Sequence, residues 1–222
     1  MRLRASALPL LMVFTLSGCS VLPRPAPPPR YHDFGPLAVP AATLSAPIDL
    51  AGVSAPPWLE GDAIWYRFLE RNPTRLREYA ENRWLAPPPR LFAQAMREYL
   101  HASDRPRYRL RLRLARFEQD FTGLTRARNV VLVHATLLDR AGLMRAQKWF
   151  QLSAPAAADV SGAVDGLSAL GERAAKKISA WAAACTGSGG SASLPQRKPD
   201  SKALSLVWSL GTRARYTRSG NK

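Results

Sequence analysis

Arginine recurs at every second position near the start of residues 107–117 (RYRLRLRLARF), and this spacing is the clearest chemical signal in the chain. Alternate side chains of a β-strand point to opposite faces, so the arginines would form a row on one face, about 7 Å apart. A planar guanidinium binds phosphate or carboxylate through paired hydrogen bonds. The row, formed by Arg107, Arg109, Arg111 and Arg113, predicts either an anion-binding face or a solvated face paired with acidic neighbours.

Catalytic and metal-binding patterns are missing from the sequence. The three histidines, His32, His101 and His134, do not lie at metal-ligand spacing with one another, with cysteine or with carboxylates. Residues 166–171 (GLSALG) have the wrong spacing for a serine nucleophile elbow, and there is no phosphate-binding loop. We therefore predict no enzymatic activity, no metal and no cofactor. A hydrolase that pairs one histidine with a nucleophile in a pocket is an alternative hypothesis.

Cys19 is a predicted acylation site. Residues 1–15 combine a basic start with an apolar stretch that is too short for a transmembrane helix, and Leu16-Ser17-Gly18-Cys19 follows. This order resembles the bacterial lipobox, in which the cysteine thiolate accepts diacylglycerol and becomes the mature N-terminus. We predict a signal peptide at 1–18 and a proline-rich tether at 19–30. An ordinary signal peptide with a chance cysteine is the alternative.

The residue after the acylated cysteine bears on the location of the protein. Ser20, rather than aspartate, follows Cys19. By resemblance to the sorting of bacterial lipoproteins, the absence of aspartate after the cysteine favours the periplasmic face of the outer membrane. Cys185 would then have no partner for an internal disulfide.

The net charge of +16 and the isoelectric point near 11.0 favour an anionic partner. Nucleic acid, anionic lipid or an acidic protein would fit this balance, and of these we predict that nucleic acid is not a partner. Arginine spread over a solvated surface is the alternative. At 222 residues, 46% of them hydrophobic, the chain is long enough for one domain with a core.

Hydrophobic periodicity predicts five strands and two helices. Alternation and β-branched or aromatic residues indicate strands at 46–54, 62–69, 107–117, 129–138 and 142–152. Apolar residues three and four apart indicate helices at 87–100 and 156–184. We interpret 71–84 as a polar connection, and we expect Glu118 and Asp120 to be solvated at a strand end.

These elements predict an α+β fold, in which a mostly antiparallel sheet packs against two helices in the order β-β-α-β-β-β-α. The domain would span residues 31–185. A flexible, basic tail would follow at 186–222.

One stretch carries a family resemblance. Its matching positions are Trp58-Leu59, Ile64, Tyr66-Arg67, Leu76, Asn82-Arg83-Trp84, Pro87 and Leu91, together with the opening segment 31–36 (YHDFGP). Over roughly residues 31–181 the chain resembles the auxiliary lipoproteins of ABC-type transport systems, the family of paraquat-inducible protein C. Glu60-Gly61 departs from the pattern, because many relatives have a more basic pair there.

The resemblance implies a non-catalytic component that works with MCE-domain proteins, which carry lipid between the bacterial membranes. Such a lipoprotein would dock the periplasmic end of the transporter's tunnel at the outer membrane, and relatives that encircle a tunnel would be ring-shaped homo-oligomers. We expect the partner contact at an exposed corner formed by Trp58, Asn82, Arg83 and Trp84, since tryptophan and arginine dominate interface energetics. For Trp84 the alternative is a core tryptophan that caps the helix beginning at Pro87.

A second hypothesis belongs to a different class. The lipoprotein would itself bind anionic lipid or an anionic envelope polymer through the arginine row at 107–113. Salt-sensitive binding of anionic vesicles would favour this hypothesis, whereas neighbouring genes for MCE, permease and ATPase proteins would favour the first.

Overall fold

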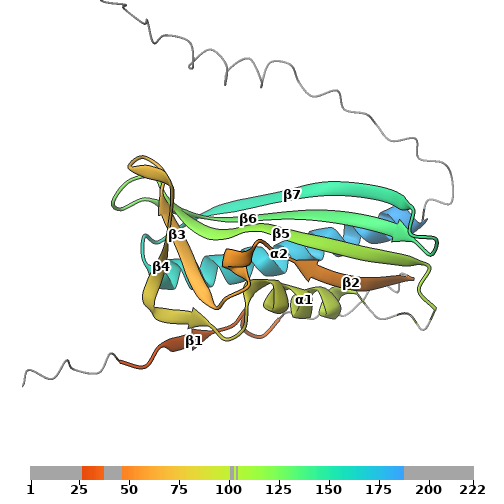
Figure 1. Ribbon diagram of the computed structural model, residues 1–222, viewed down its shortest axis with the longest axis horizontal. Helices are drawn as coiled ribbons and strands as arrows, with labels where there is room; N and C mark the ends of the chain where they lie inside the picture. Colours follow the sequence, from red (N-terminus) through yellow and green to blue (C-terminus); the bar gives the residue numbers. More distant parts are fainter. Residues whose placement is uncertain (1–26, 38–46, 101–102, 104, 188–222) are drawn as a thin grey trace, which may run out of the picture.

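The arginine-bearing segment lies inside a mixed seven-stranded sheet (Figure 1). The computed structural model describes residues 27–37, 47–100, 103 and 105–187. The strands are β1 (Arg30–His32), β2 (Ile48–Ser54), β3 (Ala63–Phe68), β4 (Asn72–Trp84), β5 (Tyr108–Phe121), β6 (Ala127–Asp139) and β7 (Met144–Ala156). The helices are α1 (Pro88–Tyr99) and α2 (Val160–Gly187), and a 3-10 turn, η1 (Pro57–Leu59), separates β2 from β3. The predicted signal peptide, Cys19, most of the tether, His101 and the tail from residue 188 lie outside the described residues.

Strand β5 has three neighbours. β6 pairs with it along one side, and β2 and β3 pair in parallel with its first and second halves along the other side. β4 and β1 continue the sheet beyond β3, and β7 lies at the opposite edge beyond β6. The α+β prediction is confirmed. The antiparallel pairs include the two longest ladders, β5–β6 and β6–β7, while the three parallel pairs make the sheet mixed.

α2 packs on one face of β5, β6 and β7, behind them in Figure 1, and α1 packs against α2 and β2. α1 opens with Pro88 and Pro89, which suit a first helical turn because their missing N–H would have no intrahelical acceptor there. α2 buries residues three and four apart: Ala163, Leu167, Leu170, Ala174, Ile178 and Ala182. Within the described ranges, neither helix is long and apolar enough to span a membrane. The other face of β5, β6 and β7, here called the open face, carries neither of these helices (Figure 1).

Two glycines allow α2 to approach the rest of the fold closely. A Cβ at Gly166 would lie 1.9 Å from Nδ2 of Asn129 on β6, and this Nδ2 donates a hydrogen bond to the Gly162 carbonyl at 2.7 Å. A Cβ at Gly171 would lie 2.8 Å from the ring of Phe34. Any larger residue at either position would therefore push α2 away from its neighbours.

The interpretation of residues 71–84 as a polar connection is wrong, because residues 72–84 form β4. This strand pairs antiparallel with β3, and most of its side chains are exposed. A strand without a buried face has no period-two hydrophobic signal, so the sequence pattern did not reveal it. β1 was missed as well, since three residues paired in parallel with the end of β4 are too short for any period to show.

Candidate functional site

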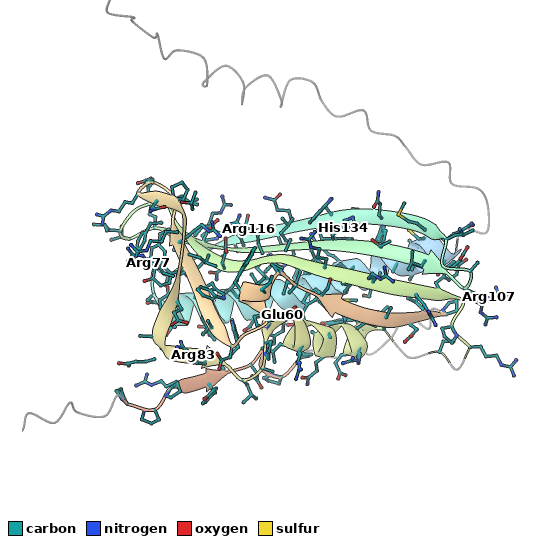
Figure 2. All side chains as sticks on the ribbon, in the orientation of Figure 1. Glu60, Arg77, Arg83, Arg107, Arg116 and His134 are labelled. Atoms are coloured by element: carbon teal, nitrogen blue, oxygen red, sulfur yellow. The ribbon has the colours of Figure 1, made fainter. Side chains whose placement is uncertain are left out.

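The arginine row lies on the open face, as the alternation predicts. Leu110, Leu112 and Leu114 are fully buried against the helices, whereas Arg109, Arg111 and Arg113 are exposed. Arg107 is also exposed but precedes the strand, and Figure 2 shows it at one end of the sheet. Among the described residues, no carboxylate comes within 4.0 Å of the guanidinium nitrogens of Arg109, Arg111 or Arg113.

The strand register places each of these arginines at the start of a row that crosses from β5 through β6 to β7. Directly opposed residues share a face of the sheet, so each arginine continues into one residue of β6 and one of β7. The rows are Arg109–Leu138–Met144, Arg111–Thr136–Gln147 and Arg113–His134–Trp149. The His134 and Trp149 rings lie 4.6 Å apart between centroids. Sequence reasoning missed the residues of β7, because the first half of this strand is exposed on both faces and alternates poorly.

Trp58, from the predicted partner corner, has a half-exposed side chain with 50% of its surface accessible. It sits in η1, which Pro56 and Pro57 introduce. The indole Nε1 of Trp65 on β3 donates a 2.8 Å hydrogen bond to the Trp58 carbonyl. The backbone that carries this exposed ring is therefore held in place by proline and by β3.

Asn82 and Arg83 have partners within the fold. A 2.9 Å hydrogen bond joins Oδ1 of Asn82 to Nε2 of His32, and so connects β4 to β1. Nη1 of Arg83 donates to the Tyr79 carbonyl at 2.6 Å, and its other nitrogens lie 3.7–3.8 Å from carboxylate oxygens of Asp62 and Glu78. Both side chains are half-buried. Asn82 joins β4 to β1, whereas Arg83 braces β4 and reaches towards Asp62 just before β3.

The expectation that Trp84 is exposed is wrong. Its side chain is 1% accessible and packs against the rings of Phe34 and Phe117, with centroids 5.9 Å and 5.5 Å away. The alternative stated for it, a core tryptophan next to the helix, is what the structure shows. β4 ends at this residue, and the chain turns immediately into α1, so the indole lies beneath the helix layer.

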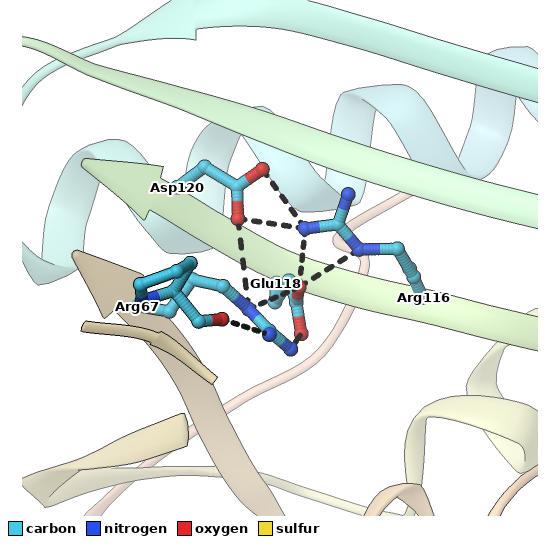
Figure 3. Close-up of polar contacts among 5 residues, drawn as sticks. Arg67, Arg116, Glu118 and Asp120 are labelled. Atoms are coloured by element: carbon cyan, nitrogen blue, oxygen red, sulfur yellow. Dashed lines mark hydrogen bonds and ion pairs between the residues drawn. The ribbon is translucent and has the colours of Figure 1, made fainter. Parts of the chain in front are cut away.

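A buried ionic network lies where β3 meets β5 (Figure 3). Glu118 accepts hydrogen bonds from Nη2 of Arg67 at 3.0 Å and from Nε of Arg116 at 2.8 Å. Nη2 of Arg116 donates to both carboxylate oxygens of Asp120, at 2.8 and 2.9 Å, and also to Glu118. Glu118 is 1% and Asp120 3% accessible, so the expectation that they are solvated is wrong. β3 pairs with β5 here, and the two arginines cover the carboxylates.

In the ionic network, burial and the neighbouring opposite charges shift each group's pKa in opposite directions. Burial raises the pKa of the Asp120 carboxyl, and the nearby Arg116 guanidinium offsets only part of this effect. Burial lowers the pKa of Arg116, but the hydrogen bonds and charges of Glu118 and Asp120 together outweigh it, so this pKa lies above its ordinary value. Two arginines neutralise two carboxylates here. The ionic network therefore joins β3 to β5, and neither Glu118 nor Asp120 is free to pair with the arginine row.

His32 and Ser168 both line a hollow of about 540 Å³ between residues 31–35 and α2. The His32 ring is hydrogen bonded to Asn82, and Oγ of Ser168 donates to the Asp33 carbonyl at 3.2 Å. The two side chains thus have other partners and do not form a nucleophile–base pair in this hollow. Within the ranges that the structure covers, no three histidine, cysteine or carboxylate side chains are grouped as metal ligands.

Two solved structures share this fold. A crystal structure of a Xanthomonas campestris protein gives a TM-score of 0.56 at 19% identity, covering 72% of this chain and 94% of that protein. A crystal structure of an uncharacterised protein gives a TM-score of 0.53 at 15% identity, covering 70% of this chain and 99% of the other. At these identities the likeness shows the fold alone. No curated protein matches the chain.

The family comparison covers most of the fold. The ABC-type transport auxiliary lipoprotein component family matches residues 35–179, a range that runs from just after β1 into α2. It includes both the partner corner and the arginine row. Since the match covers more than half of the chain, this protein belongs to the family of auxiliary lipoprotein components of ABC-type transport systems.

Proposed function

We propose that this auxiliary component is non-catalytic and serves an MCE-type lipid transport system, docking the periplasmic end of the transporter's tunnel at the outer membrane. The observation that carries the proposal is the family match over residues 35–179. A lipid anchor at Cys19 would confine the domain to the membrane surface. Anchoring raises the effective concentration of the domain for a partner at the same membrane.

Trp58 is the best candidate for the partner contact. Half of its surface is accessible, while η1 and the Trp65 hydrogen bond hold its backbone. A large side chain on a fixed backbone loses little entropy on binding, and buried tryptophans are common interface hot spots. Arg83 lies 3.8 Å from Asp62, three residues beyond η1, and would add a polar contact at the rim. Trp84 would support this corner from the core.

The test is crosslinked capture of an MCE-domain protein from native envelopes with the full-length chain. Trp58→Ala should reduce recovery about 30-fold, the effect of losing a hot spot of about 2 kcal/mol. Leu124→Ala is the matched control, because Leu124 is also an exposed apolar residue but lies between β5 and β6. Recovery that is unaffected by Trp58→Ala would move the interface elsewhere. Failure to recover any MCE-domain protein would contradict the proposal.

The second candidate function is binding of an anionic envelope ligand through the arginine row. It is favoured by one observation: Arg109, Arg111 and Arg113 are exposed and have no ion pair among the described residues. Binding of this kind weakens as salt rises, because the Debye length falls from about 10 Å at 0.1 M to about 3 Å at 1 M. Retention of a bound anionic lipid or polymer through purification at low salt, and its loss at high salt, would support this function.

A further inference from the structure

We infer that the open face of β5, β6 and β7 docks on the headgroups of an anionic phospholipid bilayer, with the sheet against the membrane and both helices turned away from it. The inference rests on the second candidate function, because it names the anionic ligand of the arginine row. It needs no transporter and is independent of the MCE partnership.

The first support is a stripe of uncompensated positive charge along β5. The carboxylates of Glu118 and Asp120 on the same strand are already neutralised by Arg67 and Arg116. The acidic residue in register with the stripe is Asp49 on β2, which is exposed beside Arg109 but is not within ion-pair distance. The stripe therefore keeps a net positive charge that one carboxylate does not cancel.

The second support is a pair of exposed apolar side chains on β7, at the two ends of a row that runs parallel to the arginines and has Gln147 between them. Met144 and Trp149 are each 53% accessible, and they end the rows that begin at Arg109 and Arg113. β6 lies between the arginines and these β7 side chains, so their separation is two strand spacings, roughly 10 Å. The His134 ring packs against Trp149 with centroids 4.6 Å apart and holds the indole on the open face.

The third support is the turn between β6 and β7, which adds exposed basic and apolar side chains next to Met144. Leu143 is 64% accessible, and Arg140 and Arg145 on either side of it are exposed. The turn is fixed, because Oδ1 of Asp139 accepts a hydrogen bond from the Leu143 N–H at 2.9 Å. In addition, Nε of Arg140 donates to the Pro106 carbonyl at 3.0 Å.

A bilayer surface fits this combination better than a soluble polyanion. Guanidinium groups bind the phosphates of lipid headgroups, and tryptophan prefers the interface between headgroups and acyl chains. A soluble polyanion would satisfy the arginines but leave Leu143, Met144 and Trp149 in water. A lipid anchor would already hold the domain at the membrane, so docking would be an intramolecular step.

The experiment uses the full-length protein, extracted from membranes and reconstituted into vesicles of phosphatidylcholine alone or with phosphatidylglycerol. Hydroxyl-radical footprinting with mass spectrometry measures the oxidation of Met144 and Trp149. Both side chains should be oxidised several-fold more slowly in the anionic vesicles than in the zwitterionic ones. Flotation of the vesicles confirms that the same amount of protein is anchored in each, and high salt should remove the difference.

Charge reversal tests whether the slower oxidation in anionic vesicles depends on the arginine row. Each arginine near an anionic surface is worth about fivefold in binding, so Arg109→Glu, Arg111→Glu and Arg113→Glu together should lower the docking equilibrium constant at least 100-fold and abolish the protection. The control carries Arg75→Glu, Arg90→Glu and Arg97→Glu, which change the net charge equally at exposed positions of β4 and α1. The control should keep the protection.

Three results would overturn the inference. Equal oxidation in both vesicle types, or equal loss of protection in the control, would show that the open face does not dock on anionic lipid. Equal protection of Met144 and Trp149 by soluble polyphosphate, without vesicles, would reassign the arginine row to a polymer. In that case the second candidate function would stand without the membrane surface. None of these outcomes bears on the MCE partnership.

Discussion

Replacing Arg116 by alanine tests whether the ionic network stabilises the sheet where β3 meets β5. The change removes both hydrogen bonds to Asp120, whose next cationic neighbour is Nε of Arg67 at 4.0 Å. Glu118 keeps Arg67 at 2.8 Å. Asp120 is 3% accessible in the intact network, so its carboxylate depends on Arg116 in place of water.

An unpaired buried charge costs about 3–5 kcal/mol. Protonation of Asp120 relieves part of this cost, so we expect a loss of about 3 kcal/mol in the free energy of unfolding at pH 7. With a urea m-value of about 2 kcal/mol per molar, the unfolding midpoint should fall by about 1.5 M. Circular dichroism in urea measures this midpoint.

The stability of the Arg116→Ala variant should also depend on pH, in a direction that the pKa of Asp120 determines. Burial already raises the pKa of Asp120, and the loss of Arg116 raises it further. Between the ordinary carboxyl pKa and this raised value the folded state binds more protons than the unfolded state, so stability falls as pH rises through that window. The destabilisation should therefore be smaller at pH 4.5 than at pH 7.

Two further variants make the test decisive. Arg113→Ala changes an exposed arginine of the same strand that has no ion pair among the described residues, and it should cost less than about 0.5 kcal/mol. Asp120→Asn, added to Arg116→Ala, removes the orphaned charge and should recover about half of the loss or more. A loss in Arg116→Ala no larger than in Arg113→Ala would refute the reasoning, as would the absence of recovery.

Two other predictions concern the attachment of α2. Gly166→Ala should destabilise the fold by about 2 kcal/mol, because a Cβ 1.9 Å from Nδ2 of Asn129 must break a buried hydrogen bond. Thermal melting measures this loss. The control is Gly61→Ala, which should have little effect because no atom lies within 4 Å of the added Cβ. Burial and its hydrogen bond to Glu172 raise the pKa of Tyr99 to about 12. The raised pKa contributes stability below about pH 10 that is lost as pH rises through 12, by up to about 1.4 kcal/mol per pH unit. Tyr99→Phe should remove this part of the alkaline decline in urea titrations at pH 9 to 12, and an unchanged decline would contradict the assignment.

The parts of the site that the sequence predicted depend on local geometry. The arginine row could be placed because period-two alternation needs only an extended backbone, and Leu110 and Leu112 are buried as expected. Trp149 could not be placed on the same surface, because its position opposite His134 depends on the register of the β6–β7 hairpin. The alternation of β7 alone is too weak to give that register.

The corrected residues were decided by strands that are distant in sequence. Glu118 and Asp120 have the composition of a solvated strand end, but β3 pairs with that half of β5 and Arg67 comes with it. Trp84 is the last residue of a polar strand, and its contacts with Phe34 and Phe117 make it a core residue. No pattern within a single segment of the sequence predicts contacts between distant strands.

The sequence by itself determined the α+β class, the two apolar helical stripes and the row of arginines, because each follows from the period of a single backbone element. The tertiary structure alone decided the parallel pairing of β2 and β3 with β5, the strand character of residues 72–84, and the burial of the ionic network. These features depend on which segments meet across the sheet. Which distant strands pair depends on the free energy of the whole fold, so the pattern of any one segment does not predict it.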